Sequence, residues 1–199
     1  MRRSLILWSI LAVLYLGFRL WYDGGGGPLT PEEVQHYVAI LVERGAEPAR
    51  IANLRKFLSD DDGRDFVMAN FIHLQEGPGA QEELDRYMAH MVPALFGRAC
   101  HPVLAGPVVG GALDLWGIEN AERWSLVGLV RYRSRRDMIE IATAPAFRDA
   151  YKFKVSSMAQ TIAIPTQPFL SLGSPRWLVA GALVTLGALL QLALGRRAA

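Results

Sequence analysis

This sequence has very little cysteine and no strong excess of one charge. The chain has 199 residues and a single cysteine, Cys100, which excludes a disulfide within the chain and a cysteine-based zinc site. Lys and Arg number 21 against 19 Asp and Glu, so the formal net charge is only +2. This balance gives no general reason to expect a nucleic acid as partner. The lone cysteine fits either side of a membrane and does not identify the redox compartment.

The sequence also lacks the motifs that are typical of metal sites, catalytic nucleophiles and phosphate-binding loops. The four histidines show neither HxxxH nor HxH spacing, so we expect no metal site and no cofactor. Cys100 and His101 are adjacent, and adjacent side chains of a strand point to opposite faces, which makes them poor catalytic partners. No G-x-S-x-G motif surrounds a serine, and no glycine-rich loop follows an expected strand. The sequence therefore contains no assembled catalytic motif.

Long apolar runs are present at both ends. Residues 4–22 carry one charge, Arg19, and would span roughly 28 Å as a helix, close to the thickness of a bilayer core. Residues 177–194 carry no charge. We expect a transmembrane helix from each run, rather than a buried core helix from the second. A cleaved signal peptide is the alternative for the first run because Arg2 and Arg3 precede it, but a small-residue cleavage site is lacking.

Arginine pairs flank the two runs on their outer sides. Arg2 and Arg3 precede the first, and Arg196 and Arg197 follow the second. The positive-inside rule then puts both termini in the cytoplasm. We therefore expect an integral protein of the inner or cell membrane. Its middle region would lie on the outer, periplasmic or extracellular side, with membrane lipid as a partner.

The middle region starts with a linker and a pair of helices. Residues 23–29 are rich in glycine and typical of a flexible linker. Residues 30–62 predict two short helices. Thr30 is a natural N-cap for the first, with Pro31 as its first residue and Glu33 completing a capping box.

Residues 63–170 predict an α+β domain. Phe66–Leu74 is a strand with apolar groups on both faces, and Arg123–Tyr132 is another. The expected order is strand 66–74, helix 80–95, strand or bent hairpin arm 102–116, strand 123–132, helices from Ser134 to about Met158 with a break at Pro145, and strand 160–170. This βαββαβ order is that of the ferredoxin-like fold. Helices would cover one face of its sheet, so we expect a homodimer that covers the other.

The stretches "NFIHL", "YMAHMVPAL" and "LVGLVRYRSRRDMIEIATAPAFRDAYKFKVSSMAQTIAIP" resemble the dimeric α/β-barrel superfamily. The chain is most similar to uncharacterised domains in which a strand ends Y-x-S, a helix starts with R-R-D and a P-x-F/Y lies within it. The resemblance covers about Gly63 to Pro168. It implies a ferredoxin-like fold and a tendency to dimerise. It implies little about chemistry, since relatives range from haem enzymes and cofactor-free monooxygenases to proteins without known activity.

Four arginines gather where the second two-faced strand meets a helix. They are Arg131, Arg133, Arg135 and Arg136. One interpretation is a solvated strand end whose arginines pair with Glu119, Glu122 or Asp137. A second is contact with acidic lipid headgroups. A third is an anionic ligand held at the helix N-terminus.

Two functions fit these observations. The first is a non-catalytic binding or interaction module held at the membrane as a dimer, with a small hydrophobic ligand as partner. The second is a cofactor-free monooxygenase or isomerase acting on a small hydrophobic substrate, with a pocket lined by Asn70, His73, His90 and Tyr132. Asn70 is polar within an apolar strand and must be hydrogen-bonded when buried, either to protein or to a ligand.

Overall fold

The computed structural model describes residues 2–171 and 173–196, so Arg197 of the topology prediction lies outside the described residues. The chain forms two units: one combines both ends, up to Gly24 and from Pro168, and the other spans Gly25–Gln167. The helices are α1 (Arg2–Asp23), α2 (Pro31–Glu43), α3 (Pro48–Ser59), α4 (Ala80–Phe96), α5 (Arg135–Thr143), α6 (Pro145–Ser157) and α7 (Pro175–Arg196). The strands are β1 (Phe66–Leu74), β2 (His101–Pro107), β3 (Leu126–Tyr132) and β4 (Met158–Thr166).

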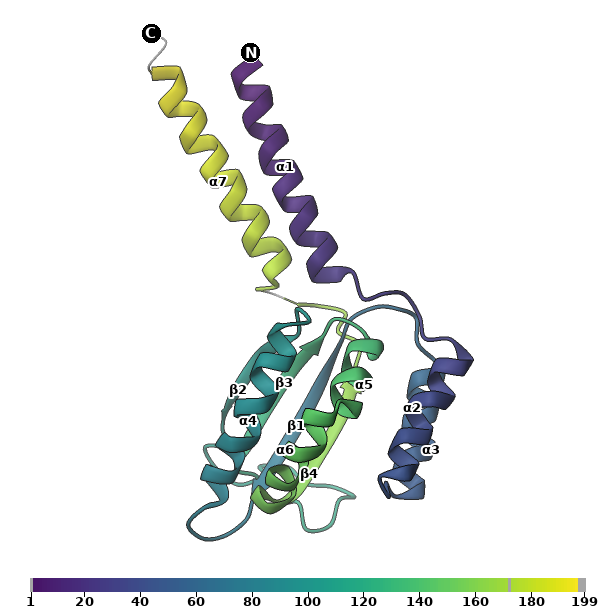
Figure 1. The fold of residues 1–199 in the computed structure, drawn as a ribbon. Helices are drawn as coiled ribbons and strands as arrows, with labels where there is room; N and C mark the ends of the chain where they lie inside the picture. Colours follow the sequence, from purple (N-terminus) through teal and green to yellow (C-terminus); the bar gives the residue numbers. More distant parts are fainter. Residues whose placement is uncertain (1, 172, 197–199) are drawn as a thin grey trace. The chain divides into compact units, whose positions relative to one another are not determined.

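The first unit is an antiparallel pair of helices, α1 and α7 (Figure 1). Near one end, the indole nitrogen of Trp8 donates a hydrogen bond to Gln191 Oε1 at 2.7 Å. Gly187 lets the helices approach closely here, because a Cβ at this position would lie 2.7 Å from the Trp8 ring. At the other end, Arg176 pairs with Asp23 at 2.7 Å. Both helices are long and apolar enough to cross a membrane.

The second unit contains a four-stranded antiparallel sheet in the order β2-β3-β1-β4. β3 lies between β1 and β2, which is the split βαβ arrangement of a ferredoxin-like fold. Asn70 lies at the centre of the sheet, opposite Gly128 of β3 on one side and Ala163 of β4 on the other. The predicted α+β ferredoxin-like fold is confirmed.

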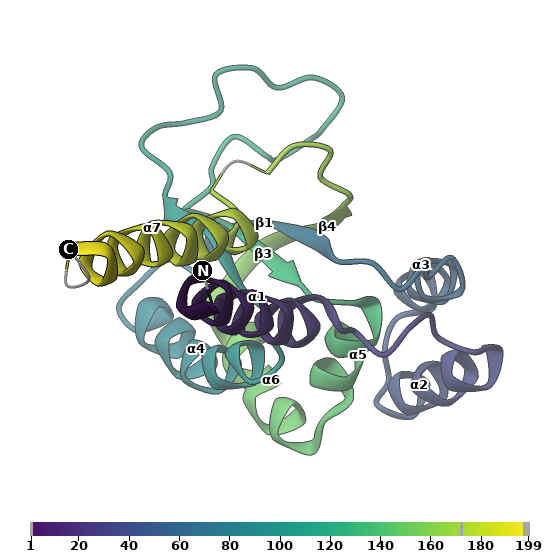
Figure 2. The same cartoon turned by 90° about the horizontal axis from the view of Figure 1, so that it is seen from above.

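Helices α4, α5 and α6 lie on one face of this sheet (Figure 2). Because side chains of a strand alternate, the even-numbered residues Leu126, Val130 and Tyr132 pack against a core that α4 and α6 supply. The odd-numbered residues of the central strands point to the opposite face. Within Gly25–Gln167, no helix covers that face. We call it the open sheet face; its apolar members are Val67, Ala69, Phe71, Val127, Leu129, Ile162 and Ile164.

Helices α2 and α3 form a second hydrophobic core together with α5. Val38 and Leu58 are 2 % and 0 % exposed, and they form one cluster with the fully buried Ile139 of α5. The predicted capping box is present: Thr30 Oγ1 accepts from the Glu33 amide at 3.3 Å, and Glu33 Oε2 accepts from the Thr30 amide at 2.8 Å. Apolar burial thus attaches the pair to the sheet-and-helix domain.

Three strands have boundaries that differ from those expected. β2 ends at Pro107, and residues 108–125 form a loop instead of continuing a strand or hairpin arm to 116. Pro107 has no amide hydrogen to continue the ladder, and the glycines beyond it favour irregular backbone. β3 begins at Leu126 rather than at Arg123, and β4 covers 158–166 rather than 160–170.

Candidate functional site

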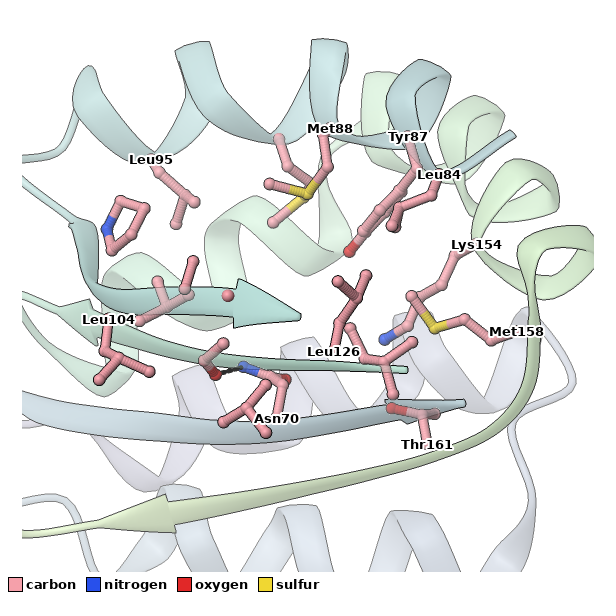
Figure 3. Close-up of a pocket in the computed structure, with 18 of the residues that line it drawn as sticks. Asn70, Leu84, Tyr87, Met88, Leu95, Leu104, Leu126, Lys154, Met158 and Thr161 are labelled. Carbon is pink, nitrogen blue, oxygen red and sulfur yellow. Dashed lines mark hydrogen bonds between the residues drawn. The ribbon is translucent and has the colours of Figure 1, made fainter. Parts of the chain in front are cut away.

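A cavity of about 210 Å³ lies between the sheet and helices α4 and α6 (Figure 3). Most of its walls are apolar. Leu84, Met88, Met91 and Leu95 of α4 line one side because their spacing of three or four residues puts them on one face of the helix. Leu126, Val130 and Met158 line the sheet side. The polar groups that reach the cavity are those of Asn70, Tyr87, Tyr132, Lys154 and Thr161.

Asn70 is held by the sheet and also borders the cavity. Its Nδ2 donates to the carbonyl oxygens of Met68 and Gly128, both at 3.1 Å. These bonds satisfy the amide donors, as a buried polar group in a strand requires. Among the described residues, no donor is bonded to Asn70 Oδ1. The structural hydrogen bonds and the neighbouring cavity therefore coexist, and the two explanations for this polar residue are compatible.

Lys154 is the one cationic side chain of the cavity lining, and Figure 3 shows its amine among Leu126, Met158 and Thr161. The ammonium has no hydrogen bond or ion pair with any residue of the described chain, and its nitrogen lies 5.9 Å from the centroid of the Tyr87 ring. Burial lowers the pKa of the Lys154 amine, and the nearby charge of Arg50 lowers it further.

Two tyrosines complete the polar lining. Burial raises the pKa of Tyr87 and of Tyr132, so both phenols stay neutral and are able to donate hydrogen bonds. The Tyr132 ring stacks on Phe66, with ring centroids 5.4 Å apart, which fixes its position at the end of β3. The site is therefore an apolar cavity with one amine, two neutral phenols, an amide and a hydroxyl.

The four residues predicted to form a pocket do not all meet. Asn70 and Tyr132 line the cavity, whereas His73 and His90 lie outside it. His73 shares the odd-numbered side of β1 with Phe71 and therefore points to the open sheet face. His90 is exposed on α4, and its ring stacks with Phe153 at 6.3 Å between centroids. Tyr87 and Met91 lie on the buried face of α4, so His90 lies on the exposed face.

The arginines of the cluster form hydrogen bonds and ion pairs with other residues of the same domain. Arg131 is 4 % exposed and donates from Nε to Asp65 at 2.7 Å and from Nη1 to the Ala99 carbonyl at 2.9 Å. Arg133 makes two hydrogen bonds to the Asp137 carboxylate, both at 2.8 Å. Asp137 in turn accepts from the Ser134 hydroxyl at 2.9 Å, at the start of α5.

The other two arginines attach the helical pair. Arg135 Nη1 donates to the Phe57 carbonyl of α3, and its guanidinium carbon lies 4.6 Å from the centroid of the Phe57 ring. Arg136 pairs with Glu33 of α2 through both nitrogens of its fork. This pairing holds the pKa of Glu33 at about 2, well below its usual range. Contact of the cluster with an external anion or lipid stays a prediction that these internal pairs do not support.

Comparison with known proteins shows the fold. No family model matches the chain, and no curated protein matches it either. A protein of unknown function from Rhodopseudomonas palustris matches in structure with a TM-score of 0.51 at 20 % identity, covering 63 % of this chain and 96 % of that chain. Its methylated form matches with a TM-score of 0.51 at 21 % identity, covering 65 % and 96 %. The likeness is one of fold alone.

A more distant match is a dimeric ferredoxin-like protein of unknown function from Jannaschia sp. It has a TM-score of 0.38 at 15 % identity and covers 52 % of this chain and 99 % of that one. A similarity this low carries no inference about assembly or activity. The ferredoxin-like architecture therefore rests on the sheet order and register of this chain together with the Rhodopseudomonas palustris match.

Sequence reasoning missed Lys154 and gave Tyr87 no role beyond the core. A signal for Lys154 was present in the helical spacing. Phe147, Ala150 and Lys154 fall at positions i, i+3 and i+7, and the first two pack in the core, so the lysine shares the buried side of α6. A charged residue on the apolar face of a helix is the pattern that would have identified it.

We expect Asp137→Asn to destabilise the domain by roughly 2–4 kcal/mol, because the change leaves the half-buried Arg133 and the buried Ser134 without their charged acceptor. Urea denaturation of the full chain in a non-ionic detergent measures the loss. Asp149→Asn, at an exposed position of α6, is the control and should change the free energy of unfolding by no more than about 0.5 kcal/mol. Equal unfolding midpoints for the two variants would contradict the structural role of the cluster.

Proposed function

We propose that the chain is a membrane-anchored binding module whose cavity holds a small, mostly apolar ligand. The observation that carries this proposal is the cavity of about 210 Å³ with apolar walls and a few polar groups, lying under two helices of the ferredoxin-like unit. Mostly apolar cavities with a few convergent polar groups are typical of small-molecule sites. Since liquid water takes about 30 Å³ per molecule, this space suits a ligand of roughly seven to nine non-hydrogen atoms.

The alternative of a cofactor-free enzyme has less support. Its acid–base candidates included His73 and His90, and neither lines the cavity. Tyr87 and Tyr132 have raised pKa values, which disfavours either phenol as a general base near neutral pH. Binding without chemistry is therefore the function that the geometry supports best.

Two features support anchoring in a membrane. The windows Ser4–Asp23 and Pro175–Gly195 have mean hydropathies of 1.7 and 2.0, and only 6 % of each is buried. The antiparallel contacts Trp8–Gln191 and Asp23–Arg176 put the start of α1 and the last turns of α7 at the same end of the helix pair. With the flanking arginines, this arrangement supports cytoplasmic termini and a ferredoxin-like domain on the outer side.

The open sheet face supports a homodimer. Strands β1 and β3 place Val67, Phe71, Val127 and Leu129 on it, where no helix of the same unit covers them. Contiguous apolar surface of this kind is typical of interaction sites. A second copy of the chain presents the same apolar surface, so two-fold packing of sheet on sheet would bury both faces at once.

The ligand proposal is tested by filling the cavity. The full chain in amphipols should give saturation-transfer NMR signals with cyclohexylmethanol, a neutral probe of suitable size. Met88→Trp should weaken this binding at least about tenfold, since the indole would occupy space next to Met91. Ala89→Trp, one position along on the exposed side of α4, should bind as the unsubstituted chain does. Unchanged binding in Met88→Trp, or no binding by the unsubstituted chain, contradicts the proposal.

The dimer is tested at the centre of the open sheet face. Leu129→Asp should convert the dimer to monomer or aggregate, because an unpaired charge in an apolar interface costs several kcal/mol, on the order of 3–5. Multi-angle light scattering of the full chain in detergent gives the mass. Val155→Asp is the matched control, at a position of α6 that is 57 % exposed. An unsubstituted chain that is monomeric at micromolar concentration would refute the dimer.

Sidedness is tested with reporter fusions in a bacterial host. Alkaline phosphatase inserted among the glycines 24–27 should be active, since that segment is expected outside the cytoplasm. The same reporter fused after Arg197 should be inactive. The reverse pattern would overturn the orientation while leaving both spans in place.

A further inference from the structure

Lys154 presents an amine to an apolar cavity without any acidic partner. The Lys154 side chain is half-buried. Charges that are withdrawn from water in proteins are usually paired, because an unpaired charge loses hydration without compensation. The Lys154 ammonium has no ion pair or hydrogen bond with the described residues, and its nitrogen lies 5.9 Å from the centroid of the Tyr87 ring. The described residues therefore supply no hydrogen-bond acceptor for this amine.

The groups that face Lys154 leave the need for an anion unmet. From α3, the exposed Arg50 adds a second positive charge and is itself hydrogen-bonded to the Tyr151 hydroxyl of α6 at 3.0 Å. From α4, Tyr87 contributes a neutral phenol. From the sheet, Thr161 and Asn70 contribute a hydroxyl and an amide. The local field is positive, and the neighbouring polar groups include hydrogen-bond donors.

Figure 3 shows how the side chain enters the cavity. Lysines on an amphipathic helix commonly bend their long stems outward, so that the ammonium reaches water. In α6 the neighbours on the same side, Phe147 and Ala150, are packed into the core, and the Lys154 amine points in among Leu126, Met158 and Thr161. A lysine aimed inward in this way is suited to a ligand rather than to solvent.

We propose that Lys154 is the anchor for a carboxylate group on an otherwise apolar ligand. The inference rests on the proposed binding function and specifies its ligand class. The carboxylate would accept hydrogen bonds from the ammonium and from a neighbouring hydroxyl, while the apolar part packs between Met88, Met91 and Leu126. Arg50 lies outside the cavity lining, so the Lys154 ammonium is the one cation that a bound group would contact there, and it matches the single charge of a carboxylate. A phosphate, with up to two charges, would leave excess negative charge in an apolar space.

Two probes of nearly equal shape test the head group. Cyclohexanecarboxylate and cyclohexanecarboxamide differ in charge but not in their number of non-hydrogen atoms. We expect the full chain in amphipols, at pH 7, to bind the carboxylate about tenfold tighter or more by isothermal calorimetry, the advantage typical of a charge-assisted hydrogen bond. Lys154→Met should remove this preference, so that both probes bind with the affinity of the amide.

Lys152→Met is the matched control. Lys152 lies two residues away on the same helix, is exposed and has its amine 5.0 Å from the Phe153 ring centroid. Its loss removes the same charge from the domain without touching the cavity, so the carboxylate preference should remain about tenfold. Equal loss of preference in both variants would assign the effect to general electrostatics and overturn the anchor.

The remaining outcomes distinguish the proposed role of Lys154 from the proposed binding of ligands in the cavity. If the unsubstituted chain binds both probes equally, Lys154 is not an anion anchor, while the cavity still binds small apolar molecules. If it binds neither the two probes nor cyclohexylmethanol, both proposals are refuted. The comparison in the unsubstituted chain needs no variant, so it remains decisive even if Lys154→Met fails to fold.

Discussion

The packing of α4 and α6 on one face of the four-stranded sheet is the constraint on which the other features depend. Side chains of β1 and β3 alternate between the two faces, so every residue is committed either to the helices or to the open side. The even-numbered residues Leu126 and Val130 fill the space under the helices, except where the cavity remains. The odd-numbered residues, Leu129 among them, point to the open sheet face. The packing of helices on one face of the sheet thus creates both the cavity and the open sheet face.

The arginine cluster stabilises this arrangement at the junction of β3 and α5. Arg133 and Ser134 bind the same Asp137 carboxylate, which fixes the start of α5 against the end of the strand. Arg135 and Arg136 extend the contacts to α3 and α2. The helical pair is therefore attached by charge at its polar edge and by Ile139 in its core. Positive charge at this helix N-terminus is tolerated because each guanidinium has an acceptor nearby.

The cavity and the apolar terminal helices fit a common role. With the proposed membrane anchoring, the chain would meet amphiphilic molecules, which have an apolar body and one polar end. The cavity has matching features, since apolar side chains from α4 and the sheet surround it and one amine, that of Lys154, enters it. Among the described residues the amine has no hydrogen-bond or ion-pair partner, whereas every member of the arginine cluster has one. That contrast is the basis for proposing Lys154, rather than the arginines, as a contact for a ligand.

The sequence by itself determined the order of elements and the class of fold. Hydrophobic periods of 2 and 3.6 residues located the strands and helices, and the capping residues Thr30 and Ser134 located two helix starts. The sequence did not predict the end of β2 at Pro107 or the start of β3 at Leu126, because the end of a strand depends on its pairing with the partner strand.

Only the tertiary structure decided which side chains meet. It brought Asn70, Tyr132 and Lys154 together from two strands and a helix, and it turned His90 outward. It also gave each clustered arginine its partner, such as Glu33 for Arg136 across more than a hundred residues of sequence. The physical reason is that local patterns fix a residue's backbone conformation and its face. Contacts between distant residues depend on how those faces pack.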